Sequence, residues 1–440
     1  MLLNKDIFTK FALLGIISEI IYLLLYVVEP LRKIADDKGI VLRNSSLFII
    51  VVSFLLLLSC LYFFAYQQIR KNNTSLQSII VFSLLFNITL IFIWPISSFD
   101  FFSYIYRARI FSHHDANPFL ATYNNFSNDA FYYLINNKWS IYTTLYGPIF
   151  ILFSSFLTFI SGNNFALSFF LLKISFIIFN LLNILLIQKT FNNKIATFLY
   201  AWNPLIIFEF CVNGHNDVIL IFFLLLAFFF ILKKQNTIFN YSLSWFFLIL
   251  SILFKFITII LVPIFFFLII FNIKGKKNKL LFIFLAILIT TLCFVIFYFP
   301  FWNGIETLLR IVNHANETTN SVYFYSFFVL LISMILNLFH KNYLTIAPLA
   351  GKITFFFSYL YLIAKLLINW NKQKIYAIIK YSLYAIFLFY FTFFTWLMPW
   401  YYTLLIVLLI FYYATEKKER HVYYIIFITV VGSLYYLILR

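Results

Sequence analysis

Charged residues are scarce in this chain of 440 residues. Asp, Glu, Lys and Arg together make up only 10% of it, whereas 64% of its residues are hydrophobic. The apolar share of a soluble globular domain is nearer about one half. This composition excludes a soluble globular protein, and the mean hydropathy of +0.97 indicates a polytopic membrane protein.

Acidic residues are the scarcer of the two charge types. The chain has 14 Asp and Glu against 32 Lys and Arg, which gives a net charge of +18. The basic residues lie in short clusters between hydrophobic runs, as in cytoplasmic loops that meet anionic lipid headgroups. No basic face or nucleic-acid-binding module accompanies them. The charge therefore predicts contact with membrane lipids and no contact with nucleic acid.

Cysteine is rare, and metal-binding patterns are lacking. Cys60, Cys211 and Cys293 lie within or beside apolar runs and show no metal-ligand spacing, which argues against a disulfide framework. The adjacent His113 and His114 do not share a helical face, so they do not predict a zinc site. There is also no Asp-x-Asp motif. We expect no required cofactor, and the sequence leaves dependence on a divalent metal open.

Hydrophobic runs, by contrast, recur from one end of the chain to the other. A helix of about 17 to 25 apolar residues can cross the hydrocarbon core of a bilayer. The first run follows a positively charged start without a small-residue cleavage site, so we expect an uncleaved first span. The candidate segments lie near 10–28, 46–66, 78–97, 146–161, 165–188, 195–211, 217–232, 239–254, 256–272, 280–299, 325–339, 346–368, 375–395, 401–414 and 421–439.

The basic clusters predict the topology. Cytoplasmic loops are rich in Lys and Arg, so the N-terminus and most basic clusters should face the cytoplasm, and three spans then place Asp100 outside. The basic segment 29–45 is an exception, because it also falls outside. Successive spans must place their loops on alternate sides of the membrane. To keep the basic clusters inside, segment 146–188 must make one net crossing and segment 325–339 must make none, which leaves about 13 crossings.

The predicted fold is thus an all-α, polytopic transmembrane bundle in the cell membrane. We expect one membrane domain over 1–440, without internal repeats. Its predicted parts are two N-terminal spans (1–77), a core (78–299) with a large outer loop (98–146), and C-terminal spans (300–440) with a second outer loop (300–324).

Asp100 opens the first outer loop and is the first candidate for catalysis. A carboxylate at the membrane surface can take a proton from a hydroxyl and act as a general base. Ionisable residues at membrane depth are costly, which favours a functional role. The alternative is that Asp100 caps the helix expected over 101–111, since Asp is a good N-cap.

The residues after Asp100 combine arginines with aromatic side chains. Tyr104, Arg107, Arg109 and His113 lie in this segment, and Tyr146 closes the loop. The planar fork of arginine suits phosphate oxygens, and a lipid phosphate would lie at this depth. The alternative is that these side chains only anchor the protein among headgroups.

A second polar cluster lies in the sequence WNPLIIFEFCVNGHND. Turn chemistry alone explains Asn213 and Gly214. His215, Asn216 and Asp217 exceed what a turn requires, because Asp217 leads directly into an apolar run. Asp217 is therefore either the N-cap of the next span or a carboxylate of the site.

Lys255 interrupts about thirty apolar residues. It either snorkels to the surface or marks a turn between helices, and its predicted outer position makes it a candidate phosphate ligand. Glu306, Arg310 and His314 recur every four residues on one helical face, and Pro399 lies in the sequence MPWYY. For these two segments interfacial packing is the default interpretation.

These elements, in this order, resemble the GT-C superfamily of integral membrane glycosyltransferases. Within it, the chain looks most like bacterial polyprenol-phosphate-mannose-dependent mannosyltransferases. The order and spacing of the segments carry the resemblance, which runs from Trp94 to Tyr402 and leaves the first two spans out. The matching segments are Asp100 with Tyr104, Arg107 and Arg109; Asn117-Pro118-Phe119; Tyr146-Gly147-Pro148; WNPLIIFE with NGHND; SILFKF; and MPWYY.

The resemblance implies a multi-helix bundle with a large first outward loop and a sugar donor carried on a polyprenyl phosphate. It assigns Asp100 the role of catalytic base or acceptor-positioning residue, and it places His215, Asn216 and Asp217 near the same cavity. Donor-phosphate binding by Lys255 is our own inference. One departure is that two spans precede the loop with Asp100, whereas the simplest members of the superfamily have one.

The resulting hypothesis is an inverting transfer of a hexose, mannose by resemblance, from a polyprenyl-phosphate donor to a glycan or lipid-linked acceptor on the outer face. The predicted catalytic residues are Asp100, Asp217 and His215. The predicted substrate and phosphate ligands are Arg107, Arg109, Lys255, Tyr104, His113, Asn216 and Tyr146. A transporter or flippase for a lipid or anionic solute is the alternative, although such proteins usually show the structural repeats that this sequence lacks.

Overall fold

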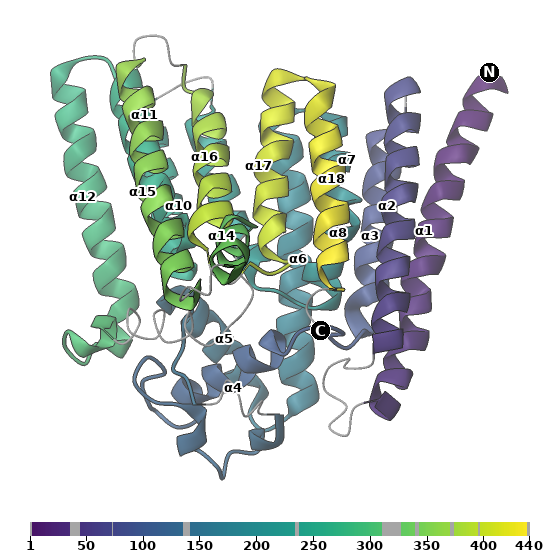
Figure 1. Ribbon diagram of the computed structural model, residues 1–440, viewed down its shortest axis with the longest axis horizontal. Helices are drawn as coiled ribbons and strands as arrows, with labels where there is room; N and C mark the ends of the chain where they lie inside the picture. Colours follow the sequence, from purple (N-terminus) through teal and green to yellow (C-terminus); the bar gives the residue numbers. More distant parts are fainter. Residues whose placement is uncertain are drawn as a thin grey trace.

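The computed structural model describes residues 2–35, 45–72, 74–134, 141–233, 237–309, 327–338, 343–369, 374–394 and 397–437. Helices run through all of these segments and no strand occurs in them, which confirms the predicted all-α fold. The long helices stand side by side and run in roughly the same direction (Figure 1). The helix α4 and the segments that follow it lie at the lower end of these helices. Arg310 and His314 lie outside the described residues.

The helices follow the hydrophobic runs of the sequence. The N-terminal half contains α1 (Leu2–Ala35), α2 (Ser45–Lys71), α3 (Leu76–Thr89), α4 (Asp100–Ser112), α5 (Pro148–Ser161), α6 (Phe165–Phe191), α7 (Lys194–Ala201), α8 (Pro204–Ile207) and α9 (Asp217–Ile231). The C-terminal half contains α10 (Ile238–Phe254), α11 (Val262–Asn272), α12 (Lys276–Tyr298), α14 (Phe327–Leu338), α15 (Tyr343–Ile368), α16 (Ala377–Leu388), α17 (Tyr401–Glu416) and α18 (Glu419–Tyr435).

Shorter helical turns connect or extend these helices. The 3-10 turns are η1 (Leu90–Phe92), η2 (Tyr123–Asn125), η3 (Tyr132–Leu134), η5 (Phe256–Leu261) and η6 (Phe299–Phe301). The π-helical turns are η4 (Phe208–Val212), which continues α8, and η8 (Phe389–Phe393), which continues α16. Such π-turns often occur at functional sites, because they displace the side chains that follow them.

Five helices in the described residues are long and apolar enough to cross a membrane. They are Lys10–Val28, Leu47–Lys71, Phe165–Phe191, Lys276–Phe301 and Ile346–Ile368. A sixth span is formed if Lys194–Ala201 and Pro204–Val212, which meet at a bend of 47°, count as one. The remaining apolar helices are shorter, so the count of about 13 crossings stays a prediction.

Three of the basic clusters that were predicted to be cytoplasmic, which contain Arg70, Lys194 and Lys418, lie at the same end of the bundle. Arg70 at the end of α2 forms an ion pair with Glu419 at the start of α18, at 2.5 Å. Nζ of Lys194, at the start of α7, donates to the carbonyl oxygen of Thr74 at 3.2 Å. In Figure 1 this is the upper end, whereas α4 lies at the lower end.

Buried polar side chains hold the middle of the bundle together. Asn180 of α6 donates to Asn87 of α3 at 2.8 Å and accepts from the Tyr200 hydroxyl of α7 at 2.8 Å. Asn183 donates both to Tyr200 and to the carbonyl oxygen of Val218 at 3.0 Å. In lipid, close packing and interhelical hydrogen bonds replace the hydrophobic drive between helices. This network therefore fixes α6 against the start of α9.

The two predicted outer loops contact each other at the lower end of the bundle. Asn117 Nδ2 donates to the carbonyl oxygen of Phe301 at 2.6 Å and to Asn303 Oδ1 at 2.9 Å. Inside the first loop, the amide of Thr144 donates to the carbonyl oxygen of Pro118 at 3.0 Å. The Asn-Pro-Phe segment thus joins the start and the end of the first loop to the segment after α12.

Candidate functional site

Asp100 is the first residue of α4. Its backbone N–H donates to Ser98 Oγ at 3.1 Å, and Ser103 Oγ donates to the Asp100 carbonyl oxygen at 2.8 Å. The N-cap position belongs to Phe99, and among the described residues the carboxylate of Asp100 caps no N–H of the helix. The side chain is therefore available for another role, with 33% of its surface exposed.

The Asn-Gly-His-Asn-Asp turn packs directly on the start of α4. Gly214 has a positive φ of 69°, and a Cβ atom there would lie 2.4 Å from Cδ2 of Phe101. Only glycine fits this conformation and this close approach. The turn consequently brings Nδ1 of His215 to 3.8 Å from Oδ2 of Asp100.

His215 lies between two carboxyl groups. Its side chain is fully buried and stacks on Trp400, with ring centroids 4.0 Å apart. Nε2 lies 3.3 Å from Oε2 of Glu209, on the side opposite Asp100. Neither ring nitrogen makes a well-formed hydrogen bond among the described residues. The stacking on Trp400 also explains the position of the MPWYY segment, which joins the site from the C-terminal half.

Glu209 is a residue that the sequence interpretation missed. It lies in η4, and its side chain is fully buried. It accepts hydrogen bonds from the Tyr436 hydroxyl and, at 3.2 Å, from Nδ2 of Asn213. The available signal was an acid within the apolar run PLIIFEFCV, because an ionisable residue at membrane depth is a functional candidate.

Lys255 and Asp217 form a buried ion pair. Nζ of Lys255 lies 2.8 Å from both carboxylate oxygens of Asp217, the first residue of α9. Lys255 has an extended backbone between α10 and η5, so it marks a break between helices, as one of the two interpretations predicted. Its ammonium group also lies 4.8 Å from the centroid of the Tyr401 ring.

The Tyr-Gly-Pro segment docks beside this lysine. The Gly147 amide donates to the carbonyl oxygen of Phe254 at 3.0 Å. A Cβ atom at Gly147 would lie 1.9 Å from the carbonyl oxygen of Leu253. The end of the first outer loop is therefore in direct backbone contact with the residue before Lys255.

Arg107 is a buried cation on the same face of α4 as Asp100, two helical turns further along. Its side chain is mostly buried, and Nε has no hydrogen-bond partner among the described residues. Its Cζ atom lies 5.8 Å from the centroid of the Tyr146 ring, which in turn packs edge-on against Tyr104 at 5.1 Å. The structure thus brings Arg107, Tyr104 and Tyr146 together beside Asp100.

The charges around Asp100 and His215 set their protonation. Burial raises the pKa of Asp100 to about 6, against the lowering effect of the Lys255 and Arg107 cations, and Asp217 contributes to the rise. Solvent at the exposed third of the side chain moderates this rise. Burial lowers the pKa of His215 well below its usual range, and the Lys255 cation adds to this effect. At neutral pH this gives an ionised Asp100 and a neutral His215.

Asn216 completes the cluster. Its side chain is fully buried, and neither Nδ2 nor Oδ1 has a hydrogen-bond partner among the described residues. Buried polar atoms without partners are costly, and native proteins rarely leave them unsatisfied. Asn216 therefore has both a donor and an acceptor free for a polar ligand.

Arg109 and His113 lie elsewhere. Nε of Arg109 donates to both oxygens of Asp129 at 2.9 Å, Nη1 donates to the Gly162 carbonyl oxygen at 2.7 Å, and Nη2 donates to Asn163 Oδ1 at 2.8 Å. His113 Nδ1 instead lies 2.8 Å from Ser112 Oγ. The structure does not bring either residue together with Asp100. Asp129, which we did not single out from the sequence, is the centre of this second cluster.

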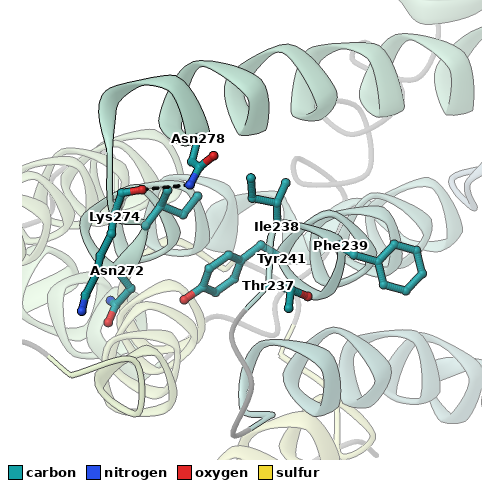
Figure 2. A pocket seen from close by; sticks show the side chains of 8 residues that line it. Thr237, Ile238, Phe239, Tyr241, Asn272, Lys274 and Asn278 are labelled. Carbon is teal, nitrogen blue, oxygen red and sulfur yellow. Dashed lines mark hydrogen bonds between the residues drawn. The ribbon is translucent and has the colours of Figure 1, made fainter.

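Neither a metal cluster nor a described pocket adds to the site. No group of three or more His, Cys, Asp or Glu side chains in the described segments is arranged to hold a metal ion. A pocket of about 650 Å³ lies at the opposite end of α10 from Lys255, and Figure 2 shows Tyr241, Asn272 and Lys274 around it. It contains none of the predicted site residues.

Comparison with known proteins identifies the family. A family model described as alpha-(1->6)-mannopyranosyltransferase, N-terminal domain, matches residues 27–271, more than half of the chain. No curated protein and no solved structure matches. The matched region contains Asp100, His215 and Lys255, and it includes α2, which the resemblance described above had left out. The chain therefore belongs to the alpha-(1->6)-mannopyranosyltransferase family, a family of mannosyltransferases.

Proposed function

We propose that this protein transfers a mannosyl group from a polyprenyl-phosphate donor to a hydroxyl of a glycan or lipid-linked acceptor on the outer face of the cell membrane. The family supports mannosyl transfer. The observation that carries the mechanism is the position of the partly exposed Asp100 carboxylate, next to a neutral His215 and within the field of the Arg107 and Lys255 cations.

Asp100 acts as the general base. With a pKa of about 6, its carboxylate is ionised at neutral pH and basic enough to assist removal of a hydroxyl proton. The acceptor oxygen attacks the anomeric carbon while the bond from that carbon to the phosphate oxygen breaks. This single displacement inverts the configuration and needs no covalent intermediate on the protein.

Arg107 and Lys255 stabilise the departing phosphate. Negative charge develops on the leaving group, and fixed cations in a partly dehydrated site stabilise it best. None of the ion pairs among the described residues involves Arg107, so its charge is available to a phosphate. Lys255 is already paired, which gives Asp217 the role of orienting this lysine. Tyr104, Tyr146 and Asn216 line the remaining part of the substrate site.

The test uses the purified full chain in liposomes with radiolabelled polyprenyl-phosphate mannose and a panel of glycan acceptors. We expect radiolabelled product with this donor and none with a nucleotide-linked mannose. Use of nucleotide-linked mannose alone would contradict the proposal. Transport of a lipid across the liposome membrane that the Asp100→Asn variant leaves intact would instead favour a flippase.

A further inference from the structure

A pocket of about 650 Å³ lies between the start of α10, the end of α11 and the start of α12, and the proposed reaction does not use it (Figure 2). Pockets of roughly 300–1,000 Å³ are typical of sites for small ligands. The helix α12 has 23 residues and rises about 34 Å, and the segment at its far end contacts Asn117 of the first outer loop. The pocket therefore lies at the membrane face opposite to Asp100.

The chain around this pocket carries positive charge only. Lys274 lines the pocket, and Lys276, Lys277 and Lys279 follow in the first turn of α12. No Asp or Glu occurs in residues 218–305, and none of the ion pairs among the described residues involves these lysines. The positive end of the helix dipole repels cations at a helix N-terminus. An anion bound here would therefore relieve an unfavourable concentration of charge.

The start of α12 offers backbone donors to such an anion. Its N-cap is Gly275, with a positive φ of 82°, so no side chain caps the helix. The amide of Lys279 donates to the Gly275 carbonyl oxygen at 3.2 Å, whereas the amides of Lys276, Lys277 and Asn278 precede the first bond of the helix. Free amides at a helix N-terminus bind phosphate groups well. Asn278 also lines the pocket, which places these donors at its edge.

Tyr241 supplies a second, independent donor from α10. Its side chain is 1% exposed, and its hydroxyl has no hydrogen-bond partner among the described residues. Figure 2 shows this hydroxyl pointing across the pocket towards Asn272 of α11. A buried tyrosine hydroxyl usually has a partner, and native proteins rarely leave a buried polar atom unsatisfied. The pocket is thus built to hold a group that accepts a hydrogen bond.

The surface beside the pocket is apolar and exposed. Phe239 lines the pocket and is 69% exposed, and Leu280 and Phe284 on the first turns of α12 are 58% and 61% exposed. In a bilayer such a surface meets the acyl chains of lipids. A ligand with a phosphate group in the pocket and acyl chains along α12 therefore fits this region better than free phosphate does.

We propose that this pocket binds the phosphate group of an anionic membrane lipid. The Tyr241 hydroxyl and the first amides of α12 donate to the phosphate oxygens, and Lys274 with the lysines of α12 neutralises the charge. A zwitterionic headgroup binds less well, because these lysines favour a net negative lipid. The inference does not depend on the proposed glycosyl transfer, because the two sites lie at opposite membrane faces.

The test titrates the purified full chain in detergent with phosphatidylglycerol, phosphatidylcholine or inorganic phosphate, and native mass spectrometry measures the Kd of each. We expect phosphatidylglycerol to bind at least about tenfold more tightly than phosphatidylcholine. Equal affinity for the two lipids would overturn the role of the lysines. Inorganic phosphate that binds as tightly as phosphatidylglycerol would overturn the assignment to a lipid.

Tyr241→Phe separates ligand binding from a merely structural role. The change removes one hydroxyl, so the Kd for phosphatidylglycerol should rise about tenfold, as expected for the loss of one hydrogen bond to a charged group. Without lipid the thermal midpoint should stay the same or rise, because the hydroxyl has no partner among the described residues. A lower midpoint without lipid and an unchanged Kd would show a structural role and overturn the inference.

Lys274→Gln tests the charge of the pocket, with Lys189→Gln as the matched control. Lys189 is an exposed lysine in the last turn of α6, and it does not line the pocket. We expect Lys274→Gln to weaken binding of phosphatidylglycerol and to reduce its dependence on salt. Lys189→Gln should keep the wild-type Kd. An unchanged Kd in Lys274→Gln, or an equal loss in Lys189→Gln, would overturn the inference.

Discussion

Lys255 and Asp217 form an ion pair in which Nζ lies 2.8 Å from each carboxylate oxygen. The pair joins the break after α10 to the first residue of α9, and both side chains are largely buried. A bonded lysine has a fixed position, so a donor phosphate would meet a cation that does not have to be ordered on binding. The pair thus holds α9 and α10 together and also lies in the candidate site.

Breaking this pair should destabilise the protein. Asp217→Asn leaves a buried ammonium group without its counterion, and removal of one partner of a buried pair typically costs about 3–5 kcal/mol. We expect a lower thermal midpoint in detergent and a higher KM for the donor. The double variant Asp217→Asn/Lys255→Met should recover stability but not donor affinity. If the stability lost in the double variant equals the sum of the losses in Asp217→Asn alone and Lys255→Met alone, the two residues do not act as a pair.

Asp100→Asn should abolish turnover while leaving donor binding intact. The amide cannot accept the acceptor's proton, so kcat should fall by about 100-fold or more. The measurement is the rate with saturating donor, beside direct binding of the lipid donor. Asp115→Asn is a matched control, because Asp115 lies exposed in the same loop. Equal activity of the two variants would remove Asp100 from the mechanism.

The rate should rise with pH through the pKa of Asp100, which is about 6. The base works only when ionised, so kcat falls as the pH drops through this value and the carboxylate becomes protonated. Arg107 lowers this pKa, so Arg107→Gln should move the acid limb to higher pH and raise the KM for the donor. If the acid limb of the pH profile of kcat does not move in Arg107→Gln, a group other than Asp100 controls it.

Arg107 and Arg109 should behave differently when each is replaced by Gln. Arg109 is bonded to Asp129, Gly162 and Asn163, and its replacement removes the guanidinium cation from the buried Asp129 carboxylate, so it should cost up to about 3–5 kcal/mol of stability. The protein that remains folded should keep the wild-type KM for the donor. Thermal unfolding and donor titration measure both effects, and a selective loss of donor affinity in Arg109→Gln would return this residue to the site.

The sequence predicted which residues the candidate site contains better than it predicted the contacts between them. Asp100, Tyr104 and Arg107 are spaced by four and three residues, so one face of a helix carries all three. Arg109 lies two residues beyond Arg107, which turns it to another face, and this spacing was enough to separate the two arginines. The sequence interpretation treated them alike.

Other contacts depended on tertiary structure. The approach of His215 to Asp100 needs the turn at Gly214 to press against Phe101, and no local pattern reveals that contact. The π-turn that directs Glu209 towards His215 likewise has no sequence signature. Most apolar runs were recognised as helices, but length alone cannot say which of the shorter ones cross the membrane.

The close contact at Gly147 has a mechanical consequence. Its amide is bonded to Phe254, and the space for a side chain is already filled by the backbone of α10. The closing end of the first outer loop is therefore coupled to the backbone that carries Lys255. Any motion of that loop during substrate entry would pull on the lysine and, through it, on Asp217 at the start of α9. The position of the loop would in this way influence the position of Lys255, the proposed phosphate ligand.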